Sequence, residues 1–172
     1  MASKVITLGG GCFWCIEGSL SRVKGITKAI SGYMGGKSPN PTYEQVCSGN
    51  SGHAEVVQVT YDPAVIDTEK VLYYFWKVHD PTTLNRQGND VGTQYRSVIF
   101  YHDEEQATVA RRSMDELQKT LSSPIVTQLL PVEKFYEAEE YHQNYFARNP
   151  TQGYCSYVVR PKVEKVLQLQ KM

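Results

Sequence analysis

The feature that most constrains this chain is a run of three glycines, Gly9–Gly11, followed directly by Cys12. The apolar run Val5–Leu8 before it predicts a strand, and Ile16–Val23 after it can wind as a helix. Glycines permit a tight turn with positive φ, and the first N–H groups of a helix carry the positive end of its dipole. A thiolate at that position is stabilised, so we expect a lowered pKa for Cys12 and a reactive thiol. The alternative is a buried structural cysteine in a glycine-rich turn.

Four cysteines are present, and two of them form a C-x-x-C pair, Cys12 and Cys15. A zinc site built on such a pair needs a second pair of cysteines or histidines nearby, and the sequence offers none. We therefore predict no metal. A C-x-x-C pair behind a strand is more typical of redox chemistry, so general dithiol–disulfide exchange is one interpretation of the chain.

The overall charge is balanced, with 18 Lys and Arg residues against 18 Asp and Glu residues. This balance argues against partners recognised by charge, such as nucleic acids or membrane surfaces. No apolar run approaches the ~20 residues that span a bilayer, and the first strand begins too early to leave room for a signal peptide. We therefore expect a cytoplasmic protein with transient disulfides. Its length fits one domain, residues 1–172, and a monomer.

Hydrophobic periodicity predicts strands that alternate with helices. The expected strands beyond the first are Gly25–Gly32, His53–Tyr61, Arg96–Tyr101 and Ile125–Leu130. The expected helices begin near Asp67, Asp103, Glu137 and Pro161, with a helical turn at Tyr43–Cys47. Two long irregular stretches, 33–52 and 81–94, interrupt this order, and loops of such length are usually functional or mobile.

This order fits an α+β fold, a two-layer sandwich or plait with a ferredoxin-like mixed sheet and a long irregular C-terminal segment. Residues 147–172 form the expected mobile tail, which carries Cys155 just after a run of turn-forming residues. Along the strand His53–Tyr61, alternation places Glu55 on the face that also carries Val57, so its carboxyl is either solvated or half-buried.

Five short motifs follow one another along the chain. They are GCFWC at 11–15, GHAEVV at 52–57, GNDVGTQYRS at 88–97, YHQNY at 141–145 and GYC at 153–155. Taken together, they show that the chain resembles the peptide methionine sulfoxide reductases of the A type, which reduce the S epimer of methionine sulfoxide. The resemblance extends from Lys4 to about Val166. It implies an α/β roll or two-layer plait, an enzyme without a bound cofactor, and oxidised proteins and free methionine sulfoxide as substrates.

Reduction of a sulfoxide needs a nucleophile at sulfur and a proton for the departing oxygen. The attacking thiolate becomes a sulfenic acid, and a second thiol condenses with it to a disulfide that an external dithiol reduces. The resemblance assigns the nucleophile to Cys12, the proton donor to Glu55, and two assisting phenols to Tyr43 and Tyr95. A carboxyl among aromatic rings should have a raised pKa, which suits a proton donor.

The resemblance also assigns a substrate pocket. Phe13 and Trp14 match the pair that holds the S-methyl group, although neighbours on a helix do not share a face, so both line a pocket only at its rim or in an irregular turn. Asp90, His142 and Tyr145 correspond to pocket or rim positions. Ordinary packing is the alternative for Phe13, Trp14, His142 and Tyr145. For Tyr43 and Tyr95 the alternative is a role as core or loop-anchoring tyrosines.

Recycling leaves a choice between two thiols. Cys155 matches a resolving cysteine of the family, and we favour a Cys12–Cys155 disulfide that thioredoxin, or dithiothreitol in its place, reduces. Cys15 lies three residues from Cys12 and is the alternative. Two rival functions stay open: a general C-x-x-C dithiol–disulfide oxidoreductase, and a module that only binds methionine sulfoxide or a metal.

Overall fold

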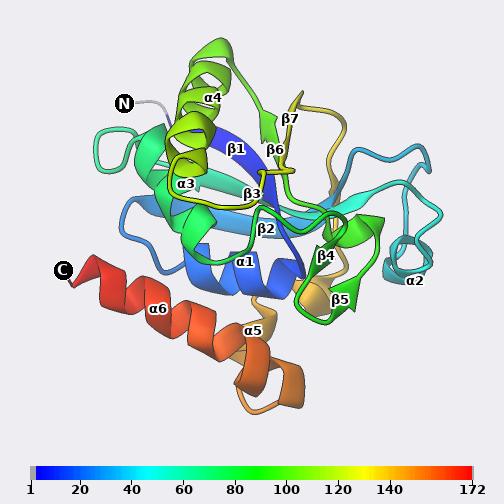
Figure 1. Ribbon diagram of the computed structural model, residues 1–172. Coiled ribbons are helices and arrows are strands. Elements are labelled where there is room, and N and C mark those ends of the chain that lie inside the picture. The colour runs from blue at the N-terminus through cyan, green and yellow to red at the C-terminus, as the bar shows by residue number, and fades with distance from the viewer. Residues whose placement is uncertain (1–2, 172) are drawn as a thin grey trace.

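The centre of the fold is an antiparallel strand pair formed by β1 (Lys4–Gly9) and β3 (Ala54–Tyr61) (Figure 1). The computed structural model describes residues 3–171. Lys4 lies opposite Tyr61 at one end of the pair, and Leu8 lies opposite Val57 toward the other. This pair sits in the middle of a six-stranded sheet with the strand order β7-β6-β1-β3-β2-β8.

The remaining strands are paired antiparallel, except that β6 and β7 run parallel. The strands are β2 (Ile26–Met34), β6 (Val98–Tyr101), β7 (Gln128–Pro131) and β8 (Tyr136–Glu137). The helices are α1 (Phe13–Leu20), α2 (Tyr43–Cys47), α3 (Thr68–Lys77), α4 (Glu104–Gln118), α5 (Tyr145–Arg148) and α6 (Arg160–Gln170). The mixed sheet and its helices confirm the predicted α+β class.

The two faces of the sheet have different covers. On β3, Val57 and Val59 belong to the main core, which also contains the buried side chains of α1, α3 and α4. Ala54 and Val56 point to the opposite face, where a smaller core forms under Phe135 and the chain around β7. The alternation read from the sequence is therefore confirmed, and it places Glu55 on the face that the helices cover.

Three segments differ from the sequence-based expectation. The second loop contains a small hairpin, β4 (Arg86–Gln87) and β5 (Asp90–Val91), followed by the 3-10 turn Thr93–Tyr95. The single helix expected from Glu137 is broken into β8, the 3-10 turn Glu140–His142 and α5. The break lies at Asn144, whose φ of 52° is left-handed and cannot continue a helix.

The third difference is the C-terminal segment, which is helical rather than irregular beyond residue 154. The π-helical segment Cys155–Val159 leads directly into α6, which runs alongside α1 (Figure 1). Gly18 of α1 faces this segment, and a Cβ there would make ordinary van der Waals contacts with Val159 and Val163, at 3.4 and 3.6 Å. Burial of Val163 and Val166 on α6 explains why a sequence rich in polar residues still forms a packed helix.

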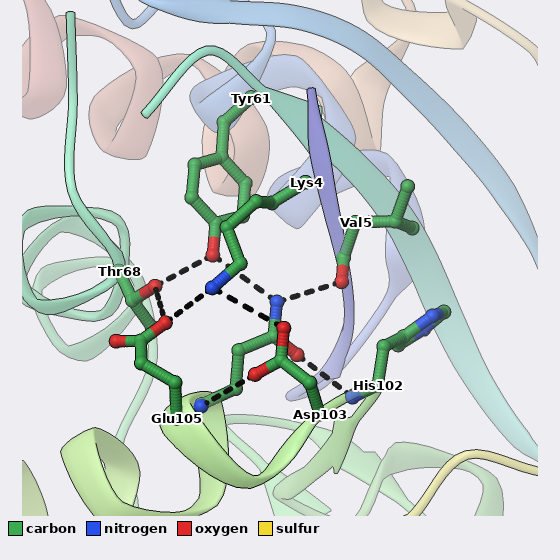
Figure 2. Close-up of polar contacts among 8 residues, drawn as sticks. Lys4, Val5, Tyr61, Thr68, His102, Asp103 and Glu105 are labelled. Atoms are coloured by element: carbon green, nitrogen blue, oxygen red, sulfur yellow. Dashed lines mark hydrogen bonds and ion pairs between the residues drawn. The ribbon is translucent and has the colours of Figure 1, made fainter. Parts of the chain in front are cut away.

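A polar network joins the outer end of the β1–β3 pair to α3 and α4 (Figure 2). The Lys4 ammonium lies between the carboxylates of Asp103 (3.2 Å) and Glu105. The Gln106 side-chain amide donates to the Val5 carbonyl (2.8 Å) and to the Tyr61 hydroxyl (3.1 Å). The buried Gln106 side chain also accepts a bond from the His102 backbone (2.7 Å), so its polar groups are satisfied.

None of the helices among residues 3–171 is both long enough and apolar enough to cross a membrane.

Candidate active site

The turn between β1 and α1 fixes the position of Cys12. Gly11 has a φ of +87°, and its backbone N–H donates to the carbonyl of Tyr95 (3.1 Å). A Cβ on Gly10 would lie 2.7 Å from the buried ring of His79, so no larger residue fits there without displacement. Cys12 then caps α1, with its carbonyl accepting from the Cys15 N–H (3.0 Å). The glycines therefore serve close packing as well as the turn.

The environment of the Cys12 thiol is apolar, and the expected lowering of its pKa is wrong. Only 6% of the residue is exposed, and burial raises its pKa well above the ordinary value. The negative charges of Glu55 and Cys15 raise it further, while the backbone N–H of Trp14 opposes the rise. Desolvation outweighs the helix start here because the thiol is enclosed.

The carboxyl of Glu55 lies beside this thiol. Its Oε1 accepts from the backbone N–H of Phe13 (3.1 Å), and its buried Oε2 has no hydrogen-bond partner among the described residues. The residue is 1% exposed, and burial raises the pKa of Glu55 to about 8, with a further contribution from the charge of Asp90. Most Glu55 side chains are therefore protonated at neutral pH, and the expected raised pKa is confirmed.

Two phenols surround the same carboxyl. Tyr43, on α2, and Tyr95, at the end of the 3-10 turn, are both half-buried. Burial raises the pKa of each phenol, and the charge of Glu55 is the next cause in both cases. Cys47, at the end of α2, lies beside both hydroxyls. The structure thus brings Cys12, Glu55 and the two phenols together.

Sequence reasoning missed the residue that holds α2 in place. Glu139 accepts the Tyr33 hydroxyl on one oxygen (2.9 Å) and the Tyr43 backbone N–H on the other (3.0 Å). Strand β2 and the start of α2 are thereby tied to one carboxylate, which keeps its charge because these bonds lower its pKa despite partial burial. Nothing in the sequence around Glu139 distinguishes it from the exposed Glu140 beside it.

Phe13 and Trp14 both contact the buried His142 ring. The Phe13 ring is fully buried, and its centroid is 5.3 Å from that of His142. Trp14 is half-buried, donates from Nε1 to His142 Nδ1 (3.1 Å), and stacks on Tyr145 at 3.8 Å with ring planes 6° apart. Tyr43 also contacts the His142 ring, at 4.3 Å. These rings form one continuous aromatic wall beside Cys12.

A cavity of about 850 Å³ opens on Cys12 from the side of the β4–β5 hairpin. It is lined by Cys12, His79, Gln87, Asp90, Tyr154 and Lys162, among others. Asp90 accepts a short hydrogen bond from Tyr154, whose oxygen lies 4.0 Å from the sulfur of Cys15. Tyr154 belongs to the GYC motif, for which the sequence analysis predicted a role only at the neighbouring Cys155.

All four cysteines are free thiols. Cys15 and Cys155 are fully buried, and the negative charge of Cys15 contributes to the raised pKa of Cys155. Cys155 begins the segment Cys155–Val159, which packs against α1. No group of three or more His, Cys, Asp or Glu side chains within residues 3–171 is arranged to hold a metal ion.

Comparison with known proteins gives this constellation its context. Residues 4–172 match the family described as peptide methionine sulfoxide reductase. The chain belongs to this family. The peptide methionine sulfoxide reductase MsrA of Nautilia profundicola is 56% identical over 162 residues, which cover 94% of this chain and 93% of that protein.

Solved structures agree. Mxr1 from Saccharomyces cerevisiae in reduced form has a TM-score of 0.84 at 39% identity, with 89% of each chain covered. A structure of Mxr1 in complex with Trx2 has a TM-score of 0.61 at 30% identity, covering 83% of this chain and 84% of that one. The predicted family and fold are confirmed, and the chain is a methionine sulfoxide reductase.

Proposed function

We propose that Cys12 attacks the sulfur of the S epimer of methionine sulfoxide while Glu55 supplies the proton for the departing oxygen. The observation that carries this proposal is the Glu55 carboxyl, which is 1% exposed and has one oxygen without a partner. An unpaired buried oxygen is unfavourable unless a ligand completes it. A sulfoxide oxygen beside Oε2 would accept the carboxyl proton.

The step balances without a cofactor. The thiol and the sulfoxide give methionine and a Cys12 sulfenic acid, with the sulfoxide oxygen transferred to the cysteine sulfur. The charge of Glu55 is the largest nearby charge that opposes a Cys12 thiolate, and protonation of Glu55 removes it. The same proton therefore makes Glu55 a donor and favours ionisation of Cys12. Tyr43 and Tyr95 assist by donating hydrogen bonds to the same oxygen, for which their raised pKa values keep them protonated.

The aromatic wall supplies the substrate pocket in this proposal. Phe13 and Trp14 hold the S-methyl group, and the neutral His142 and Tyr145 support Trp14 from behind. Asp90 accepts the Tyr154 hydroxyl and lines the cavity that opens on Cys12. The rings of the aromatic wall do not line that cavity, so Asp90 is proposed for the rim of the pocket on the opposite side of Cys12 from the wall. Because this pocket recognises one side chain, we propose both peptide-bound and free methionine sulfoxide as substrates.

Cys155 is our proposed resolving thiol, and thioredoxin our proposed reductant. A disulfide needs Cα atoms about 4.4–6.8 Å apart. Because Cys155 is fully buried, we propose that the tail 147–172 opens locally, at the segment Cys155–Val159, for this thiol to reach Cys12. Cys15 is the alternative, since it needs only the start of α1 to adjust. The yeast relative solved in complex with Trx2 supports a thioredoxin partner.

The rest of the proposal is a single monomeric domain over residues 1–172, without metal or prosthetic group, in the cytoplasm. Four free thiols and a cycle that depends on a dithiol reductant support a reducing compartment.

The decisive assay uses racemic methionine sulfoxide with dithiothreitol. We expect only the S epimer to be consumed, and Cys12→Ser to abolish consumption. Cys155→Ser is the matched control, because it keeps the nucleophile and should still release one methionine per chain in the absence of reductant. Activity that survives Cys12→Ser would contradict the assignment of Cys12 as the nucleophile.

The resolving thiol is identified by mass spectrometry after one turnover without reductant. A Cys12–Cys155 disulfide supports the favoured route, a Cys12–Cys15 disulfide supports the alternative, and a persistent sulfenic acid excludes both. General dithiol–disulfide exchange predicts instead that insulin is reduced at an unchanged rate in Glu55→Gln. The structural fit of Glu55 and the phenols to a sulfoxide argues against that rival.

A further inference from the structure

The second turn of α1 carries a buried carboxyl that the reaction does not use. Glu17 is 3% exposed, and its Oε1 accepts a short hydrogen bond from the backbone N–H of Asn144. Asn144 lies 127 residues further along the chain, so this bond joins the helix of the nucleophile to the late aromatic segment. A buried carboxyl retained at such a place calls for a reason beyond packing.

The partner of Glu17 is a strained residue. Asn144 has φ 52° and ψ 36°, the left-handed conformation that non-glycine residues adopt at a cost. It follows the 3-10 turn that ends at His142 and precedes α5, which begins at Tyr145. The Glu17 carboxyl therefore stabilises the one residue whose conformation sets the angle between these two turns.

The two turns hold Trp14 between them. His142, before the strained residue, accepts the indole N–H of Trp14, and Tyr145, after it, stacks on the indole face. A change in the angle at Asn144 would therefore separate one of these contacts from Trp14. Trp14 lies next to Phe13 on α1, the helix that also carries Glu17 and that Cys12 precedes. The same helix therefore positions the nucleophile and the aromatic wall.

We propose that Glu17 is a positioning residue that fixes the Trp14 ring for the sulfoxide by holding Asn144 in its left-handed conformation. The effect on turnover rests on the proposed function, in which Trp14 and Phe13 hold the S-methyl group of the substrate. The structural part of the proposal concerns Trp14 alone and is open to test without substrate.

Burial of Glu17 makes its hydrogen bond to Asn144 dependent on pH. Burial raises the pKa of Glu17 to about 7, while the Asn144 N–H and Arg22 oppose the rise. Arg22 itself donates to the Gly18 carbonyl (2.6 Å) and lies over the Phe146 ring at 5.2 Å, and Arg160 of α6 lies over that ring at 5.6 Å.

On the late segment, Arg148 faces the carbonyls of Glu140 and Gln143 rather than Glu17. Burial lowers the pKa of His142, so it stays a neutral acceptor for Trp14 over the same range. A carboxylate accepts an N–H bond more strongly than a carboxylic acid does. The grip on Asn144 therefore weakens as the pH falls through about 7.

The test uses Trp76→Phe as background, so that Trp14 is the remaining tryptophan of the two. We expect the near-ultraviolet circular dichroism of Trp14 to change with a midpoint near pH 7, the pKa to which burial raises Glu17, and Glu17→Gln to abolish the change while preserving an acceptor. Glu164→Gln, on an exposed part of α6, is the matched control and should keep the transition. The same transition in Glu17→Gln overturns the proposal.

Kinetics separate positioning from loss of the fold. Glu17→Ala should raise KM for methionine sulfoxide about tenfold with kcat within twofold, and should leave the alkylation rate of Cys12 by iodoacetamide unchanged. Asn144→Gly, which keeps the N–H and adopts the left-handed conformation freely, should behave as wild type. An equal fall in kcat and in Cys12 alkylation would overturn the positioning role. Absence of reductase activity in the wild type would refute the proposed function and leave the circular dichroism test standing.

Discussion

The two ends of the β1–β3 strand pair hold polar clusters of opposite character. At the outer end, Lys4 and Tyr61 lie opposite each other, and Gln106 completes a network in which donors and acceptors are matched (Figure 2). At the inner end, where β1 leads into Cys12, the Glu55 carboxyl has a bare oxygen. The same strands thus deliver one satisfied and one unsatisfied cluster.

The difference separates structure from chemistry. A satisfied network stabilises the fold and has no capacity left for a ligand. The inner cluster is unfavourable by the same rule, with Glu55 Oε2 and His142 Nε2 both buried and unpartnered. We conclude that stability is concentrated at the outer end and reactivity at the inner end, and five single substitutions test this division.

The largest expected effect is that of Glu55→Gln on catalysis. An amide cannot donate the proton, so kcat/KM should fall by about 10²–10⁴, the usual range for loss of a general acid. In the wild type, kcat/KM should decline as pH rises through about 8, where Glu55 loses its proton, and this limb should be absent in the variant. A pH–rate profile checks both, and an unchanged limb would contradict the role of Glu55.

At high pH, Glu55→Gln should be stabilising relative to the wild type, although it lowers activity. The folded-state pKa of Glu55, about 8, is above the ordinary value of 4.5, so its contribution to stability is present below pH 4.5 and lost as pH rises through about 8. The free energy of unfolding of the wild type should therefore fall more steeply over this range than that of Glu55→Gln. Urea denaturation at a series of pH values measures the two slopes.

The next effect belongs to the outer end. Gln106→Ala removes bonds to the buried carbonyl of Val5 and to the backbone of His102, and should lower the free energy of unfolding by about 2–3 kcal/mol. Turnover per folded molecule should stay within twofold, because the network does not touch the site. A loss of kcat larger than the loss of folded protein would erase the proposed division.

A smaller effect is expected from the phenols. Tyr43→Phe and Tyr95→Phe each remove one hydrogen-bond donor while retaining the ring, and each should lower kcat/KM about tenfold, equivalent to about 1.4 kcal/mol. Because both donors serve one oxygen, the double variant should lose less than the product of the single losses. Strict multiplicativity would show that the two hydroxyls act at separate points.

The smallest effect is that of Lys4→Met. Its partners Asp103 and Glu105 are each about half exposed, and solvent screens such pairs, so the loss should be below ~1 kcal/mol and should shrink in salt. Thermal unfolding at low and high ionic strength tests this. A loss as large as that of Gln106→Ala would mean that the ion pairs, and not the amide, hold the outer end.

The sequence predicted what depends on local pattern. Alternation along β3 placed Glu55 on the helix-covered face, and turn chemistry placed Cys12 at the start of α1. Two helices were expected to begin near Asp67 and Asp103, and each of these side chains caps its helix by accepting a backbone N–H. Such features follow from neighbours in the chain, which a single sequence contains.

What the sequence did not predict depends on contacts between distant segments. The raised pKa of Cys12 results from enclosure by chain far from the glycine turn. Glu139 joins Tyr33 to Tyr43, and Asn144 interrupts a helix-like pattern. Both roles arise only when the segment 136–148 has packed against α1. Burial of that kind has no local signal, so propensity alone favoured a continuous helix there.

The π-helical segment Cys155–Val159 has a mechanical consequence. Such segments are rare, occur mostly as single turns inside α-helices and often lie at functional sites, so we expect this one to open before the α-helical turns that follow it. Its release would free Cys155 while Val163 and Val166 stay seated in the core. In the proposed cycle through Cys155, only the segment Cys155–Val159 then has to unwind in each turnover. Helix α6 stays packed on the core throughout.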